Sequence, residues 1–83
     1  MLAIRVIYGT DWCGDCKRSK RFLDENDISY EWVDIDDDQE ARRKTMELNK
    51  GKARIPTIIF EDNSILVEPS NKELAKKLGI KYK

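Results

Sequence analysis

Two cysteines, Cys13 and Cys16, stand three positions apart and are the only cysteines in a chain that contains no histidine. Cysteine thiolates can form a disulfide with each other or hold a metal ion. A closed metal site needs about four cysteine or histidine ligands, and this sequence offers two. The residue types therefore exclude a structural zinc site within one chain and indicate a redox-active pair of thiols.

The pair follows a hydrophobic run over residues 3–8 and precedes a segment with helical character. At the start of a helix, unpaired backbone N–H groups and the positive end of the dipole favour a thiolate on Cys13, and the thiolate is the nucleophile. Cys16 would lie one turn further into the helix, where we expect it to be less exposed. We therefore predict that Cys13 attacks a substrate disulfide and that Cys16 resolves the mixed disulfide.

Two charged residues adjoin the thiols: Asp15 lies between them and Lys17 follows them. Both are expected to modulate the ionisation of the pair. A carboxylate disfavours the thiolate form, so Asp15 would make the couple more reducing, unless it only stabilises the first helical turn. Lys17 opens a basic segment that ends at Arg21, interpreted as a solvated helix face or, alternatively, as a surface that steers acidic partners.

The elements that position these residues follow from hydrophobic periodicity and turn signals. Gly51 and Gly79 are predicted helix stops, Asn63 a left-handed turn residue, and Ser70 with Glu73 a capping box. The expected elements are a strand at 3–8, a helix at about 13–26, a strand at 30–35, a helix from Asp36 or Asp37 to about Asn49, strands at 57–60 and 65–67, and a helix from Ser70 to Gly79.

This β-α-β-α-β-β-α order predicts an α/β fold in a single domain, residues 1–83. A right-handed crossover pairs the first two strands in parallel, and the last two form an antiparallel hairpin. The prediction is a mixed four-stranded sheet covered by three helices. The thiols then lie at the carboxyl end of the first strand, where open α/β sheets generally place their chemistry.

Composition limits the classes of binding partner and the cellular location that we expect. The 16 basic and 16 acidic residues cancel, which gives no global attraction to nucleic acid or membranes. No stretch approaches the roughly 20 apolar residues of a membrane span. We expect a cytoplasmic monomer with no nucleic-acid or membrane partner, in a reducing compartment where a resting disulfide would be unusual.

Three further signals appear in order along the chain. Trp12 directly precedes Cys13, Pro56 precedes a strand, and Pro69-Ser70 precedes the last helix. With these signals the chain resembles glutaredoxin-like proteins of the thioredoxin-fold superfamily, and among them the mycoredoxin type. The resemblance covers nearly the whole chain and implies the thioredoxin/glutaredoxin fold.

The resemblance also implies how the groove around Cys13 is built. It implies that Pro56 is cis and packs next to Cys13. It implies that the backbone of Ile55 pairs with the substrate as an added strand. Trp12 and the turn at Pro69-Ser70 would border the thiol-binding groove.

As to function, the resemblance implies a small dithiol-disulfide oxidoreductase without a bound cofactor or metal. Such a protein reduces protein disulfides or mixed disulfides. Its electrons would come from a low-molecular-weight thiol, either glutathione or mycothiol, or from a thioredoxin reductase.

The chain departs from the family pattern at two places and leaves one alternative open. Many glutathione-using members carry a lysine where this chain has Thr10, and Gly-Gly where it has Glu68-Pro69. Those positions recognise glutathione in the family, so the departures bear on the choice of thiol. The alternative function is an iron–sulfur cluster shared by a dimer through Cys13 and an external thiol. In this family, that function usually accompanies a single-cysteine motif.

Overall fold

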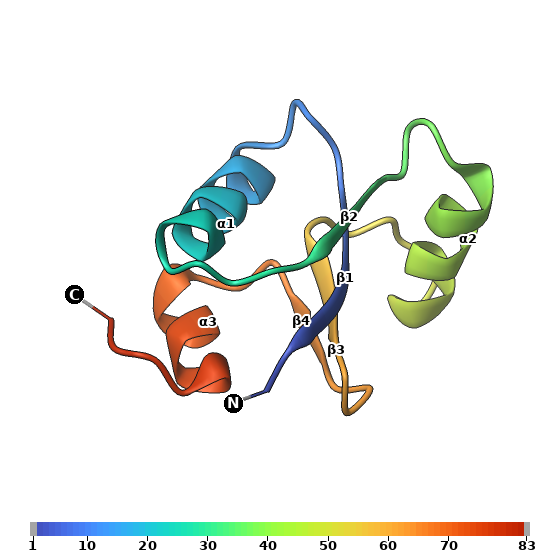
Figure 1. Ribbon diagram of the computed structural model, residues 1–83. Helices are drawn as coiled ribbons and strands as arrows, with labels where there is room; N and C mark the ends of the chain where they lie inside the picture. The colour runs from blue at the N-terminus through green and yellow to red at the C-terminus, as the bar shows by residue number, and fades with distance from the viewer. Residues whose placement is uncertain (1, 83) are drawn as a thin grey trace.

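Four strands form one mixed sheet in the order β2-β1-β3-β4 in a computed structural model that describes residues 2–82 (Figure 1). The elements are β1 (Ile4–Gly9), α1 (Gly14–Glu25), β2 (Glu31–Asp34), α2 (Gln39–Leu48), β3 (Thr57–Phe60), β4 (Ile65–Val67) and α3 (Asn71–Leu78). Strand β1 pairs in parallel with β2 and antiparallel with β3, which pairs antiparallel with β4. The predicted α/β fold, element order and mixed four-stranded sheet are confirmed.

Helices cover both faces of the sheet: α1 and α3 lie on one side and α2 on the other (Figure 1). Successive strand residues point to opposite faces. Ile7 and Ile58 therefore join the core with α1 and α3, while Val6, Tyr8 and Ile59 join a smaller core with α2. The central strands are buried on both sides, as their nearly continuous hydrophobic sequence predicts. No helix among residues 2–82 has the length and apolar character to span a bilayer.

Helix α1 begins at Gly14 with Cys13 as its N-cap residue, and the cap at its other end is Asn26. The predicted helix at about 13–26 is therefore confirmed to within a residue. One face of α1 is buried against the sheet, and its buried residues are Cys16, Ser19, Phe22 and Leu23. Their spacing of three and four residues places Cys16 on the face that packs into the core.

Helix α2 begins later than predicted. Asp38, rather than Asp36 or Asp37, is the N-cap residue, and its carboxylate accepts the N–H of Ala41 at 3.0 Å. The N–H of Asp36 is instead bound by the Asp34 carboxylate at 2.8 Å, a local turn that keeps this residue outside the helix.

Strand β2 is also shorter than the predicted 30–35. Its ladder with β1 runs only from the pair Val6–Glu31 to the pair Gly9–Asp34. Strand β1 itself ends at Gly9, one residue beyond the predicted run. The N–H of Ile35 still donates to the Gly9 carbonyl at 3.0 Å, but β1 has no further residue to extend the ladder.

The predicted helix stops and the hairpin turn are confirmed. Gly51 has a φ of 91° and donates to the Met46 carbonyl at 2.7 Å after α2. Gly79 has a φ of 73°, and Ile80 donates to the Ala75 carbonyl at 3.0 Å, as in a Schellman motif. Asn63 adopts a φ of 69° between β3 and β4.

Candidate active site

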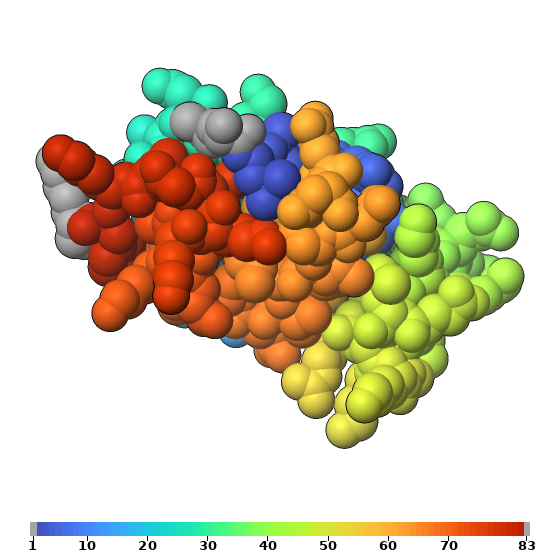
Figure 2. All heavy atoms as spheres, turned by 90° about the horizontal axis from the view of Figure 1, so that it is seen from below, coloured from blue at the N-terminus to red at the C-terminus, as the bar shows by residue number. Residues whose placement is uncertain are grey.

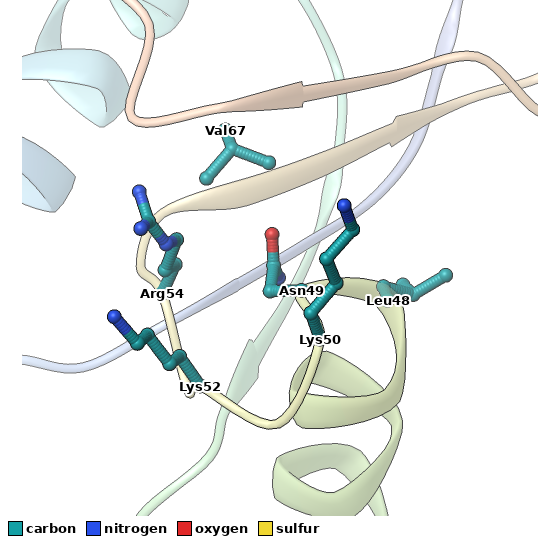
Figure 3. A pocket seen from close by; sticks show the side chains of 6 residues that line it. All are labelled: Leu48, Asn49, Lys50, Lys52, Arg54 and Val67. Atoms are coloured by element: carbon teal, nitrogen blue, oxygen red, sulfur yellow. The ribbon is translucent and has the colours of Figure 1, made fainter.

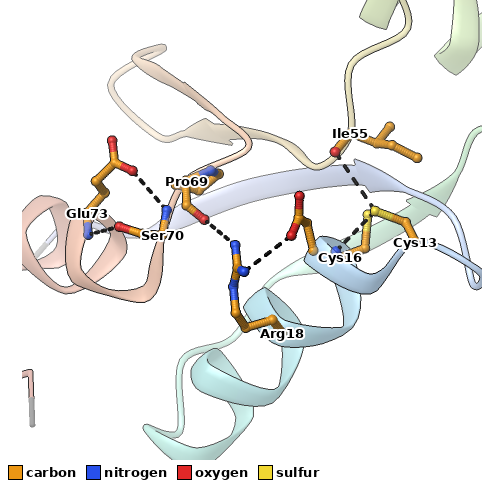
Figure 4. Close-up of polar contacts among 8 residues, drawn as sticks. Cys13, Cys16, Arg18, Ile55, Pro69, Ser70 and Glu73 are labelled. Atoms are coloured by element: carbon orange, nitrogen blue, oxygen red, sulfur yellow. Dashed lines mark hydrogen bonds and ion pairs between the residues drawn. The ribbon is translucent and has the colours of Figure 1, made fainter.

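The Cys13 sulfur lies half-buried at the start of α1, at the carboxyl end of β1 (Figure 4). As the N-cap residue, Cys13 accepts the backbone N–H of Cys16 on its Sγ at 3.2 Å. Its thiol also reaches the carbonyl oxygen of Ile55 at 3.9 Å. The N–H group and the helix dipole both stabilise negative charge on this sulfur. The site therefore suits a thiolate that can be approached from solvent.

The Cys16 side chain is fully buried one turn further along α1. Burial raises the pKa of the Cys16 thiol to about 12, and its hydrogen bond to Cys13 adds to the effect. The backbone N–H of Thr10 acts in the opposite direction. At neutral pH, Cys16 is a protonated thiol shielded from solvent, a state that suits a resolving cysteine rather than an attacking one.

Gly9 makes room for the Cys16 sulfur. A Cβ atom at Gly9 would lie 2.8 Å from Cys16 Sγ and would collide with the ring of Trp32. The bare backbone of β1 therefore allows the sulfur and the indole to pack against it. The available sequence signal is a glycine directly after the predicted strand at 3–8, a residue that often marks the close approach of another group.

The Ile55 carbonyl lies beside the Cys13 sulfur, and Pro56 follows Ile55 directly before β3. The peptide bond between Ile55 and Pro56 is cis, as the resemblance implied. Pro56 is buried, and its carbonyl accepts the N–H of Glu68 at 2.8 Å. The turn before β3 is thus bound to the turn after β4, and the Ile55 carbonyl is left facing the Cys13 sulfur.

Trp12, the residue before Cys13, is exposed to solvent over 71% of its surface. Its indole N–H donates to the Asp36 carboxylate at 2.7 Å, and Asp36 also pairs with Arg42 at 3.7 Å. The loop after β1 is thereby tied to the loop after β2 and to α2. No sequence signal marked Asp36 for this role, because 24 positions separate it from Trp12.

Arg18 links α1 to the turn before α3 (Figure 4). Its guanidinium donates to the Pro69 carbonyl at 3.5 Å and pairs with the Asp15 carboxylate at 3.2 Å. Asp15 thus has a positive partner, which its spacing of three residues from Arg18 on a helix could have indicated. Lys17 is exposed and its backbone N–H donates to the Cys13 carbonyl at 3.1 Å, but within residues 2–82 its side chain makes no hydrogen bond or ion pair with either cysteine.

Ser70 caps α3 and uses its polar groups to do so. Its hydroxyl accepts the N–H of Glu73 at 3.1 Å, and its own N–H donates to the Glu73 carboxylate at 2.9 Å. The predicted capping box is confirmed. Pro69 is fully buried beside it, so this turn is held firmly next to α1.

Comparisons with known proteins agree with this arrangement. The Glutaredoxin family model matches residues 6–65. A Mycobacterium tuberculosis protein named "Putative glutaredoxin" is 41% identical over 76 residues, which are 92% of this chain and 90% of that protein. Mycoredoxin 1 of Corynebacterium glutamicum is 32% identical over 73 residues, 88% of this chain and 90% of that protein.

Solved structures show the same fold. A mutant of the thioredoxin-like protein BC3987 has a TM-score of 0.75 at 25% identity, over 88% of this chain and 96% of that one. The glutaredoxin of Archaeoglobus fulgidus has a TM-score of 0.72 at 21% identity, over 94% of this chain and 87% of that one.

The family match spans most of the chain and includes both cysteines and the Ile55–Pro56 turn. It confirms the resemblance that the motifs of the sequence indicated. The structural neighbours confirm the expected fold. The chain therefore belongs to the glutaredoxin family, has a thioredoxin-like fold and is a thiol-disulfide oxidoreductase.

Proposed function

We propose that this protein reduces protein disulfides or mixed disulfides through Cys13 and Cys16, with a low-molecular-weight thiol as its electron source. The observation that carries the proposal is the difference between the two sulfurs. Cys13 Sγ is half-buried, caps a helix and accepts an N–H at 3.2 Å. Cys16 is fully buried one turn away, with its thiol protonated.

The reaction that fits this geometry has two exchange steps. The Cys13 thiolate attacks one sulfur of the substrate disulfide, and the other substrate sulfur leaves as a thiolate that takes up a proton. The Cys16 thiol then gives up its proton and attacks Cys13 Sγ, which releases the second substrate sulfur. Two electrons pass to the substrate, and a disulfide forms between Cys13 and Cys16. Two molecules of the small thiol reduce that disulfide and become oxidised to their own.

The walls of the substrate groove form part of the proposal. Neither the N–H nor the carbonyl of Ile55 bonds to another backbone group within residues 2–82, so both are available to pair with a substrate backbone. Trp12 would form one border and Pro69 with Ser70 the other. Because the Ser70 N–H and hydroxyl already serve the cap, Ser70 would act through shape rather than through hydrogen bonds to the substrate.

Mycothiol is favoured over glutathione as the small thiol. Thr10 is buried and offers no cation at the lysine position of glutathione-using members. In place of Gly-Gly, Glu68 pairs with Arg54 at 3.7 Å and Pro69 is fully buried. The relative named Mycoredoxin 1 supports the same choice.

Reduction of the oxidised protein by different donors tests the proposal. Glutathione, mycothiol and a thioredoxin reductase with NADPH would each be added, and free protein thiols counted by alkylation and mass spectrometry. We expect mycothiol to reduce the protein faster than glutathione does. Equal rates would contradict the choice of thiol, and no reduction by any donor would contradict the function.

The iron–sulfur alternative, the oligomeric state and the cellular location each need a separate measurement. Protein purified without oxygen is expected to be colourless, and a brown dimer would favour the cluster function. We infer that the whole chain is one domain, because all four strands belong to one sheet. The monomeric state and the cytoplasmic location stay predictions, to be checked by size-exclusion chromatography and cell fractionation.

A further inference from the structure

A basic hollow opens beside the candidate active site, where the loop after α2 leads into β3 and Val67 of β4 lies close by (Figure 3). Its volume is about 390 Å³. Arg54, in its lining, directly precedes Ile55, whose carbonyl lies 3.9 Å from Cys13 Sγ. Figure 2 shows the loop (yellow) at the surface beside the orange hairpin. The lining residues are Leu48, Asn49, Lys50, Lys52, Arg54 and Val67.

Positive charge is concentrated in this hollow although the chain as a whole is neutral. Arg54 pairs with Glu68 at 3.7 Å, and both side chains are about half exposed. Lys50 and Lys52 are exposed and have no ion-pair partner within residues 2–82. Three cations therefore face one carboxylate, and the surplus of positive charge attracts an acidic ligand.

An oriented hydrogen-bond acceptor lies among these cations. The Asn49 side-chain NH₂ donates to the Thr45 carbonyl at 2.8 Å and to the Thr57 hydroxyl at 3.2 Å. Both bonds hold the amide so that its oxygen points toward Val67, on the same side as the Lys50 and Arg54 side chains (Figure 3). That oxygen is placed to accept an N–H group from a ligand.

Apolar surface completes the hollow. Leu48 is 39% exposed, and Val67 lies half-buried on the edge strand β4. Carboxylates, a backbone N–H and an apolar side chain are all present in an acidic segment of a protein. An inorganic anion would use only the cations.

We propose that the hollow binds an acidic segment of the protein whose disulfide is reduced. The inference rests on the proposed function. A substrate strand that pairs with Ile55 continues past Arg54 toward Lys52 and Lys50, so Asp or Glu residues near the reactive cysteine meet these cations. The enzyme therefore prefers protein disulfides with acidic flanks.

The kinetic test uses two peptides that each carry one cysteine blocked with 2-mercaptoethanol. They are identical except that the glutamates near the cysteine of one are glutamines in the other. At low ionic strength the wild-type chain reduces the glutamate peptide with a kcat/KM about tenfold higher, the effect expected of two exposed ion pairs. Added salt lowers this ratio.

Matched variants test whether the loop cations cause the preference for the glutamate peptide. Lys50→Gln with Lys52→Gln reduces the ratio to about twofold or less, since both free cations are lost. Lys76→Gln with Lys81→Gln removes the same charge from α3 and the tail after it, on the face of the sheet opposite α2, and keeps the tenfold ratio. Circular dichroism verifies that both double variants are folded. Equal kcat/KM for the two peptides with the wild-type chain, or an unchanged ratio in the Lys50/Lys52 variant, overturns the proposal.

A binding measurement separates this inference from the proposed function. The glutamate peptide, with serine in place of its cysteine, is added to ¹⁵N-labelled wild-type chain. The backbone amides of Lys50, Lys52 and Arg54 shift, whereas the glutamine peptide leaves them in place. These shifts support binding of the acidic segment even if no disulfide is reduced. Failure to reduce a disulfide would contradict only the proposed function. Shifts confined to residues 17–21, or the same shifts produced by glutathione alone, overturn the proposal.

Discussion

The Cys13 sulfur lies at the open end of α1, whereas the Cys16 sulfur lies one turn further along, against Gly9 and near the Trp32 ring. Around Cys13 are a backbone N–H, a carbonyl oxygen and solvent. Around Cys16 are a bare stretch of strand and the interior of the molecule. One helical turn thus separates a sulfur that a substrate can reach from one that it cannot.

This difference shows how a helix start can assign two roles to one residue type. The first residue receives the free N–H groups and the positive dipole end. The residue three positions later lies one turn further along the helix. There it shares the face that packs into the core with Ser19, Phe22 and Leu23. Burial then raises the pKa of Cys16 to about 12. Its thiol therefore stays protonated and reacts only after a mixed disulfide forms on Cys13 beside it.

Replacing each cysteine gives the largest expected effect. Cys13→Ser abolishes disulfide reduction, because no other exposed thiol can start the attack. Cys16→Ser leaves the mixed disulfide on Cys13 unresolved, so mass spectrometry detects a stable adduct there. An adduct on Cys16 in the wild-type chain, or full activity in Cys13→Ser, would reverse the assigned roles.

Filling the space beside Cys16 tests the packing around the buried sulfur. Gly9→Ala places a Cβ against Cys16 Sγ and Trp32, and such overpacking costs about 1–3 kcal/mol. Gly14→Ala is the control, because a Cβ there meets nothing within 4 Å. Denaturant unfolding of the reduced proteins measures both. Equal stabilities of the two variants would show that Gly9 is not needed for packing.

The pH dependence of stability tests the same burial. The pKa of Cys16 rises from 9.0 to about 12 on folding, so its contribution is fully present below about pH 9 and is lost as the pH rises toward 12. The difference in unfolding free energy between the reduced wild-type chain and Cys16→Ser should therefore fall over this range. The pKa of Tyr30 is also raised to about 12, but its contribution cancels in the difference. A difference independent of pH would contradict the burial of an un-ionised thiol.

The hydrogen bond between Trp12 and Asp36 tests the exposed surroundings of Cys13. Asp36→Ala removes the acceptor of the indole N–H and should raise KM for peptide disulfides about threefold with little change in kcat, the effect of losing one exposed hydrogen bond. Asp36→Asn keeps an acceptor and should restore KM, while Asp37→Ala is the neighbouring control. The NMR shift of the Trp12 indole N–H reports the contact directly. If Asp37→Ala raises KM as much as Asp36→Ala, the contact does not explain the effect.

The smallest effect concerns Asp15, which lies between the two sulfurs in sequence. A carboxylate beside the helix start opposes negative charge on the attacking sulfur, so Asp15→Asn should stabilise the thiolate of the reduced form and make the reduction potential less negative. Arg18 already pairs with Asp15 at 3.2 Å, and the shift should stay under about 30 mV. Equilibration with a thiol redox buffer measures it. A more negative potential would disprove the electrostatic role.

The sequence by itself determined the features that depend on neighbours along the chain. The capping box of Ser70 and Glu73, the stop at Gly79 and the turn at Asn63 all formed where expected, because their side chains bond to backbone a few residues away. The element order and the pairings of β1 with β2 and of β3 with β4 followed from periodicity, from the handedness of crossovers and from the hairpin turn. The placement of Cys13 at a helix start needed no more than these rules.

Tertiary structure alone decided which distant residues meet around the two sulfurs. Asp36 looked like a helix cap, but the Asp34 turn kept it outside the helix and within reach of Trp12. The sequence assigned Gly9 no role in the site, but the packing of Trp32 and Cys16 against it leaves no room for a side chain there. The loop that carries Ile55 and its neighbouring cations comes beside Cys13 only because β3 begins opposite the end of β1. Such contacts depend on how close-packed elements fill space, which no short-range sequence pattern specifies.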